Sequence, residues 1–228
     1  MDEIEELVVR TAQRLGDILN DVVFVGGFAA WLLVTERIGR TWRSTNDVDV
    51  LVEIATPFEY QQLEAKLRKR GFAHDTREGA PICRFRHGDD LILDVMPTEE
   101  SILRFSNRWY AAAIPGAIQV TLGEDTRIRL IDAVHFVATK LDAFASGERG
   151  DMASSKDIED IVALADGRRA LSEEFASAPT VVREFVRGEL ARLIDQEALL
   201  EHLEGHLDRE GRLRLPAVRG ILSALAGR

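Results

Sequence analysis

The stretch that decides the fold reads VVFVGGFAAW over residues 22–31 and RSTNDVDVLV over residues 43–52. Its first half is a β-branched apolar run that ends at two glycines and continues in a helical pattern. That pattern predicts a strand, a tight turn and the start of a helix. Gly26 and Gly27 allow the sharp bend, and the backbone N–H groups at a helix start favour an anion. The turn is therefore a candidate site for a phosphate group.

In the second half of the stretch, Asp47 and Asp49 alternate with valines. Side chains of a strand point to alternate faces, so we expect the valines in the core and both carboxylates on the opposite face. Two like charges held side by side repel each other. A hard divalent cation such as Mg²⁺ binds carboxylate oxygens and leaves positions for phosphate. The pair therefore predicts a metal site.

The whole chain has the composition of a soluble globular protein: 228 residues, 46% hydrophobic and 30% charged. Its one cysteine, Cys83, excludes an internal disulfide and fits a reducing compartment. The acidic N-terminus does not resemble a secretory signal, and the apolar run 22–34 is too short to span a bilayer. We therefore expect a cytoplasmic protein without a membrane segment. The net charge of −10 argues against non-specific coating of nucleic acid but leaves a local basic groove open.

The pattern along the chain predicts an α+β (mixed α/β) fold with a mixed sheet flanked by helices, followed by a helical region. We expect residues 1–130 to form the α/β domain and residues 131–228 a helical domain that completes the nucleotide and acceptor cleft. Thr56 and Glu59 form a capping box at a helix start. The other expected elements are helices over 4–19, 27–37 and 132–146, a hairpin of strands 82–86 and 91–95, and short strands near 110–114, 118–122 and 126–130.

Asp94 is the one carboxylate in an otherwise apolar strand. A glycine turn before a helix, Asp-x-Asp on one strand and a third aspartate on a neighbouring strand resemble the nucleotidyltransferase superfamily related to DNA polymerase β. The matching residues are Gly26, Gly27, Asp47, Asp49 and Asp94. The resemblance implies that the three carboxylates hold two Mg²⁺ ions, or Mn²⁺ in their place, and that the turn cradles the triphosphate. It also implies that Asp94 helps to deprotonate the attacking hydroxyl.

Two downstream helices narrow the resemblance. Lys140 lies one turn from Phe136 and from Phe144, within the apolar stripe of its helix, and Asp157 lies at the edge of another stripe. Together with the first stretch, these motifs resemble the AbiEii-type toxin family of nucleotidyltransferases. The matching residues are Gly26-Gly27, Arg43, Thr45, Asp47, Asp49, Lys140-Leu141, Ala143, Lys156-Asp157 and Asp160.

The AbiEii-type resemblance implies that Lys140 contacts the nucleotide phosphates and that Asp157 belongs to the active site. It places Arg43 and Thr45 in the nucleotide site, with Thr45 beside the metal. Phe28 stands where the wider superfamily usually has a phosphate-binding serine. The phosphate contact would then come from backbone N–H groups or from Thr45.

Simpler interpretations of the downstream residues stay open. The stem of Lys140 could pack on aromatic rings with its amine in water. Asp157 could do no more than favour its helix N-terminus, and Asp160 is expected to be solvated.

Together, these expectations predict an Mg²⁺-dependent enzyme that transfers NMP from an NTP to a hydroxyl and releases pyrophosphate. The family resemblance implies tRNA or another RNA as acceptor and an antitoxin protein as partner, in a toxin–antitoxin or phage-defence setting. The acidic balance of the chain keeps a small-molecule acceptor open, as in antibiotic nucleotidyltransferases. A non-catalytic module that binds a nucleotide or a protein partner is the alternative from another class.

Overall fold

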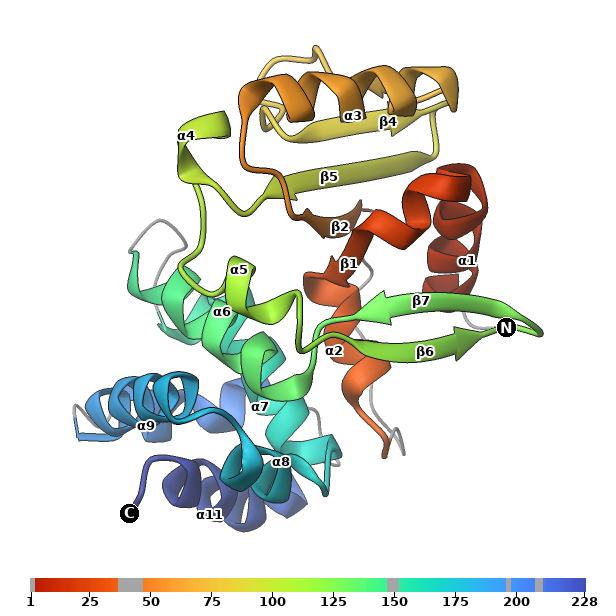
Figure 1. The fold of residues 1–228 in the computed structure, drawn as a ribbon. Coiled ribbons are helices and arrows are strands. Elements are labelled where there is room, and N and C mark those ends of the chain that lie inside the picture. Colours follow the sequence, from red (N-terminus) through yellow and green to blue (C-terminus); the bar gives the residue numbers. More distant parts are fainter. Residues whose placement is uncertain (1–2, 37–46, 147–151, 196–197, 208–210) are drawn as a thin grey trace. The chain divides into compact units, whose positions relative to one another are not determined.

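The structure, a computed structural model, describes residues 3–36, 47–146, 152–195, 198–207 and 211–228 (Figure 1). The contacts within the chain divide it into two compact units. The described part of the first unit comprises residues 3–29 and 47–131, and that of the second comprises residues 30–36 and those from 132 onward. Helix α2, Gly27–Leu33, begins in the first unit and ends in the second.

The first unit is built on a seven-stranded sheet with the order β3-β4-β5-β2-β1-β7-β6. The pairs β1–β7 and β2–β5 are parallel and the other pairs are antiparallel, so the sheet is mixed, as predicted. The strands are β1 Val22–Val25, β2 Asp47–Val52, β3 Ala73–His74, β4 Arg84–His87, β5 Leu91–Pro97, β6 Ile118–Leu122 and β7 Thr126–Leu130.

One face of the central strands is the apolar core that the alternation predicted. Val48 and Val50 on β2 lie opposite Leu93 and Val95 on β5, and all four side chains are buried. Helix α1 contacts β2, β5 and β7, and α3 lies along β4 and β5 (Figure 1). The other face of the same strands therefore carries the polar residues.

Helix α3 begins and ends where its sequence signals predict. α3 starts at the capping box: the Thr56 hydroxyl accepts from the Glu59 N–H, and the Glu59 carboxylate accepts from the Thr56 N–H. It ends before Gly71, whose φ of +87° suits a glycine. The helices are α1 Glu3–Leu15, the 3₁₀ turn η1 Gly16–Asp21, α3 Pro57–Lys69, α4 Glu100–Leu103 and α5 Tyr110–Ala113.

Three expected elements differ in the structure. The strand predicted near 110–114 is wrong: this segment is the short helix α5, which follows a turn where the Asn107 side chain accepts from the Trp109 N–H. The first helix ends at Leu15, because Gly16 takes a φ of +58° and a 3₁₀ turn follows. The helix predicted over 27–37 ends at Leu33.

The second unit is helical. Asp132 caps α6 by accepting from the N–H groups of Val134 and His135, and Ser155 caps α7. The Gly167 carbonyl at the end of α7 accepts from the N–H groups of residues 35 and 36, which joins the segment after α2 to this unit. Its elements are α6 Ala133–Ala145, η2 Met152–Ser154, α7 Lys156–Gly167, α8 Leu171–Ser177, α9 Thr180–Asp195, α10 Ala198–His202, η3 Leu203–His206, η4 Gly211–Arg214 and α11 Leu215–Leu225. Within the described residues, none of the helices combines the length and the apolar character that a bilayer crossing requires.

Replacing Thr56 by alanine tests the capping box. The variant loses the side-chain acceptor for the Glu59 N–H, so we expect the free energy of unfolding to fall by about 1 kcal/mol. Chemical denaturation of the variant and of Thr76→Ala, which alters an exposed loop threonine, measures the difference. Equal stability of the two variants would contradict the role given to the cap.

Candidate functional site

The polar face of the sheet brings the predicted carboxylates together. Asp49 on β2 lies directly opposite Asp94 on the parallel strand β5, and Asp94 lies opposite Arg84 on β4. Residues opposite each other in a sheet share a face, so these three side chains form a row across three strands. Asp47, two residues before Asp49, shares that face. The row comprising Asp47, Asp49, Asp94 and Arg84 is called the carboxylate row below.

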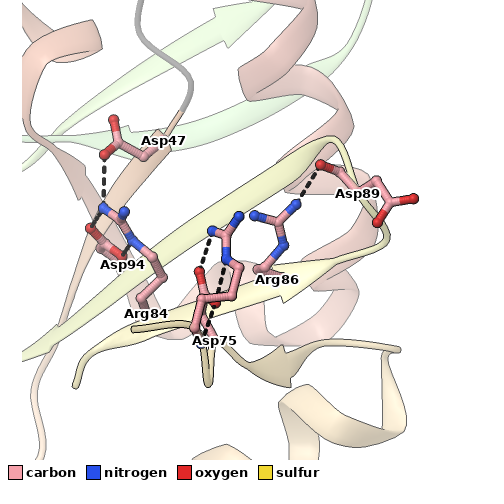
Figure 2. Close-up of polar contacts among 7 residues, drawn as sticks. Asp47, Asp75, Arg84, Arg86, Asp89 and Asp94 are labelled. Atoms are coloured by element: carbon pink, nitrogen blue, oxygen red, sulfur yellow. Dashed lines mark hydrogen bonds and ion pairs between the residues drawn. The ribbon is translucent and has the colours of Figure 1, made fainter. Parts of the chain in front are cut away.

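Arg84 binds two members of the carboxylate row (Figure 2). Its Nε lies 2.8 Å from Oδ1 of Asp94 and its Nη2 lies 2.7 Å from Oδ2, a bidentate contact. The same Nη2 lies 3.0 Å from Oδ2 of Asp47. The hydrogen bond to Asp94 raises the pKa of the Arg84 guanidinium, with the charges of Asp94 and Asp47 adding to it and burial opposing it. Arg84 is therefore a permanent cation within the row.

Asp49 is held against the glycine turn. Gly26 has a φ of +85°, and a Cβ placed on it would lie 1.8 Å from Oδ2 of Asp49. Only glycine allows both the backbone angle and the close approach of the carboxylate. The turn and the Asp-x-Asp strand are therefore one structural feature, formed where Val25 pairs with Asp49.

The first residues of α2 have separate roles. Gly27 opens the helix, and the Ala29 N–H donates to the Gly26 carbonyl. The Phe28 ring is buried and packs edge-on against Phe24, with centroids 5.9 Å apart. Phe28 is therefore a core residue, at the position where the sequence resemblance would place a phosphate-binding serine. The roles of Gly26 and Gly27 in binding phosphate stay predictions.

The donor chemistry of the row fits a divalent cation. All three acids offer carboxylate oxygens, the ligands that Mg²⁺ and Mn²⁺ prefer, and they share one face of the sheet. In the present arrangement Arg84 binds both oxygens of Asp94 and one of Asp47. Within the described part of the chain, no group of three acidic, histidine or cysteine side chains is arranged to hold a metal ion. Oxygen donors of the kind that such an ion prefers are therefore present, and Arg84 binds three of them.

Cys83 lies directly before Arg84 and is buried. Burial raises the pKa of its thiol to about 12, and the charges of Asp94 and Asp49 contribute in the same direction. The thiol is therefore neutral at physiological pH.

Lys140 and Asp157 form a buried ion cluster in the second unit. The Lys140 amine lies 3.1 Å from Oδ1 of Asp157 and 2.6 Å from Oδ2 of Asp160. It also lies 5.5 Å from the centroid of the Phe136 ring. Lys140 is 8% exposed, Asp157 0% and Asp160 6%. The interpretations of Lys140 as a lysine with its amine in water and of Asp160 as a solvated residue are therefore wrong.

The ion cluster keeps Lys140 charged. Burial alone would lower the pKa of the amine, but the charges of Asp160 and Asp157 outweigh it, and the pKa stands above its ordinary value. The roles of Lys140 toward phosphate and of Asp157 in an active site stay predictions.

Arg43 and Thr45, the other predicted nucleotide-binding residues, lie outside the described residues. The sequence analysis gave no role to Arg84 and expected Asp160 to be solvated, whereas the structure places Arg84 in the carboxylate row and Asp160 in the buried ion cluster with Lys140. Arg84 and Asp94 stand at matching positions on either side of the 87–91 turn, so an opposite-charge pair across a hairpin was the available signal. Asp160 follows Asp157 by three residues, which places both on one helix face.

Comparison with solved structures finds a likeness of fold. A nucleotidyltransferase-like antigenic protein from Paracoccidioides brasiliensis is 20% identical, with 88% of this chain and 93% of that chain covered and a TM-score of 0.49. JHP933 from Helicobacter pylori is 12% identical, with 98% and 90% covered and a TM-score of 0.48. The antibiotic-resistance factor ANT(2'')-Ia is 18% identical, with 89% and 98% covered and a TM-score of 0.47.

No protein-family model matches the chain, and the search of curated proteins gave no match.

Replacing Gly26 by alanine tests the contact between the turn and Asp49. We expect a loss of stability of more than about 2 kcal/mol, because the methyl group adds a clash with the carboxylate to the cost of a positive φ. Gly79→Ala is the matched control, since Gly79 has a φ of +78° and nothing within 4 Å of an added Cβ. Chemical denaturation measures both variants, and equal losses would contradict the close contact.

Replacing Lys140 by methionine tests the buried ion cluster. Two buried carboxylates would lose their common cation, so we expect the free energy of unfolding to fall by about 3–5 kcal/mol. Lys156→Met, which removes an exposed lysine at the start of α7, is the control and should change stability by less than about 0.5 kcal/mol. A small effect of Lys140→Met in thermal and chemical unfolding would refute a structural role for the cluster.

Proposed function

We propose that the protein is a nucleotidyltransferase that transfers NMP from an NTP to a hydroxyl acceptor and releases pyrophosphate. The observation that carries the proposal is the register of β2 and β5, which sets Asp49 opposite Asp94 with Asp47 on the same face. The contact of Asp49 with Gly26 supports it further, because it joins the acids to the predicted phosphate-binding turn.

In this proposal Asp47, Asp49 and Asp94 hold Mg²⁺, or Mn²⁺ in its place. The bound ion would neutralise the charge of the phosphates. The acceptor oxygen forms a bond to the α-phosphorus, the bond between the α- and β-phosphates breaks, and pyrophosphate leaves. Asp94 is proposed to accept the proton of the attacking hydroxyl, which requires its oxygens to be released from Arg84.

The resemblance also supports proposals for Lys140, Asp157, Arg43 and Thr45 as residues around the nucleotide. For Lys140 to bind a phosphate, its amine would have to exchange a contact with Asp157 or Asp160 for a phosphate oxygen. In the proposal the acids of the carboxylate row are therefore essential for catalysis, and these four residues only assist in binding the nucleotide.

The proposed acceptor is tRNA or another RNA, in a cytoplasmic toxin–antitoxin or phage-defence setting with an antitoxin partner, as in AbiEii-type proteins. A small-molecule acceptor is favoured by the net charge of −10, which disfavours a broad RNA footprint. A non-catalytic module is favoured by the contacts of Arg84 with Asp47 and Asp94, which neutralise the acids without a metal.

A transfer assay separates these candidates. The purified protein is incubated with Mg²⁺ and each α-labelled NTP, together with total tRNA or with a metabolite extract. We expect label on one acceptor. In Asp47→Asn/Asp49→Asn we expect the transfer rate to fall by more than about 100-fold, because mutating residues that only hydrogen-bond to metal ligands already costs about 10–100-fold in metal affinity or activity. Asp89→Asn/Asp90→Asn, which makes the same charge change in the exposed hairpin turn, is the matched control and should remain active.

The outcome identifies the class of protein. Label on RNA supports the toxin-like enzyme, and label on a metabolite supports the small-molecule enzyme. Failure to transfer label or release pyrophosphate, with no binding of any NTP by calorimetry, would overturn the catalytic proposal and leave the binding module.

A further inference from the structure

Arg84 is built into the carboxylate row by the fold. The hairpin register of β4 and β5 sets Arg84 opposite Asp94, and the parallel register of β5 and β2 sets Asp94 opposite Asp49. The Arg84 side chain is 20% exposed and that of Asp94 is 8% exposed, so the bidentate contact is largely shielded from water. A shielded pair of this kind is screened less by salt than a surface ion pair.

A divalent cation at the carboxylate row would need oxygens that Arg84 now binds. Mg²⁺ and Mn²⁺ approach carboxylate oxygens closely, and Arg84 already donates to both oxygens of Asp94 and to Oδ2 of Asp47. A guanidinium and a dication bound to the same oxygens would also repel each other over a short distance. The two cations are therefore alternatives at these oxygens.

We propose that Arg84 is the counter-ion of the metal-free site and that a divalent cation binds only when the guanidinium withdraws from Asp94 and Asp47. The inference rests on the proposed function, since it concerns the same three acids. It gives the protein two states of the site: one in which arginine neutralises the acids, and one in which the metal does.

The position of Arg84 allows the withdrawal. It is the first residue of the four-residue strand β4, and beyond β4 the sheet has only the two-residue strand β3. Its side chain is one-fifth exposed, and a change of arginine rotamer would turn the guanidinium toward solvent without a change in the sheet. Phosphate oxygens of an arriving nucleotide are suitable new acceptors for a guanidinium. Binding of metal and nucleotide would then be mutually favourable.

A Mn²⁺ titration tests the competition without any catalytic readout. Free Mn²⁺ is followed by electron paramagnetic resonance as it is added to the wild type, Arg84→Met and Arg86→Met in the absence of nucleotide. Arg86 is the matched control: it lies two residues along on the same face of β4 and donates to the Asp89 carbonyl. We expect Arg84→Met to bind Mn²⁺ about tenfold or more tightly than the wild type, and Arg86→Met to stay within about threefold of it.

A second measurement uses stability. In a chelator, Arg84→Met should melt below the wild type because its acids have lost a cation. Added Mn²⁺ should raise its melting temperature more than that of the wild type or Arg86→Met. If Arg84→Met does not fold, Arg84→Lys is titrated in its place. Lysine keeps the positive charge but cannot bind both oxygens of Asp94 as the planar guanidinium does. The affinity of Arg84→Lys for Mn²⁺ should therefore be higher than that of the wild type.

The failures of the two proposals are distinguishable. Equal Mn²⁺ affinity in the wild type and the Arg84 variant would overturn the competition and leave the metal site of the proposed function. Absence of Mn²⁺ binding in every variant would overturn both, because the acids would then have no role toward a metal.

Discussion

The parallel pairing of β2 with β5 is the constraint on which the rest of the site depends. In β2 and β5 the apolar side chains that alternate with the acids lie on the buried face, and the acids lie on the polar face. A shift of the pairing by one residue would turn every side chain of a strand to the opposite face. The burial of Val48, Val50, Leu93 and Val95 therefore fixes the place of the acids between them. The carboxylate row is a consequence of how the core packs, and no separate loop is needed to assemble it.

The same pairing explains why the glycine turn belongs to the site. β1 runs antiparallel to β2, so that Val25, the residue before Gly26, lies opposite Asp49. The turn must then pass directly beside the carboxylate, and only glycine leaves room for it. In the second unit the charged residues are buried, with Lys140 between Asp157 and Asp160. Removing one of these charges would destabilise the fold by more than the ion pairs stabilise it, because it leaves a buried charge without a partner.

Much of the fold could be predicted because its signals are local. The alternation in Asp47–Val52, the capping box at Thr56 and the Asp132 cap each predict an element within a few residues, and the structure confirms them. Residues 110–114 form a helix where the sequence predicts a strand, because a run this short has no clear period and it follows a turn in which the Asn107 side chain accepts from the Trp109 N–H.

The grouping of the acids was also predictable, but their partners were not. Arg84 lies in the predicted strand 82–86, and its contacts with both Asp94 and Asp47 depend on the register of three strands. Lys140 stood out by its apolar neighbours, yet its contact with Asp160 depends on how α6 packs on α7.

The most direct test of the proposed metal site is a crystal structure with Mn²⁺ and a non-hydrolysable NTP, collected at a wavelength where manganese scatters anomalously. We predict an anomalous peak about 2 Å from carboxylate oxygens of Asp49 and Asp94, with the Arg84 guanidinium withdrawn from Asp94. A structure without an anomalous peak at the row, in which Arg84 still binds both oxygens of Asp94, would contradict it.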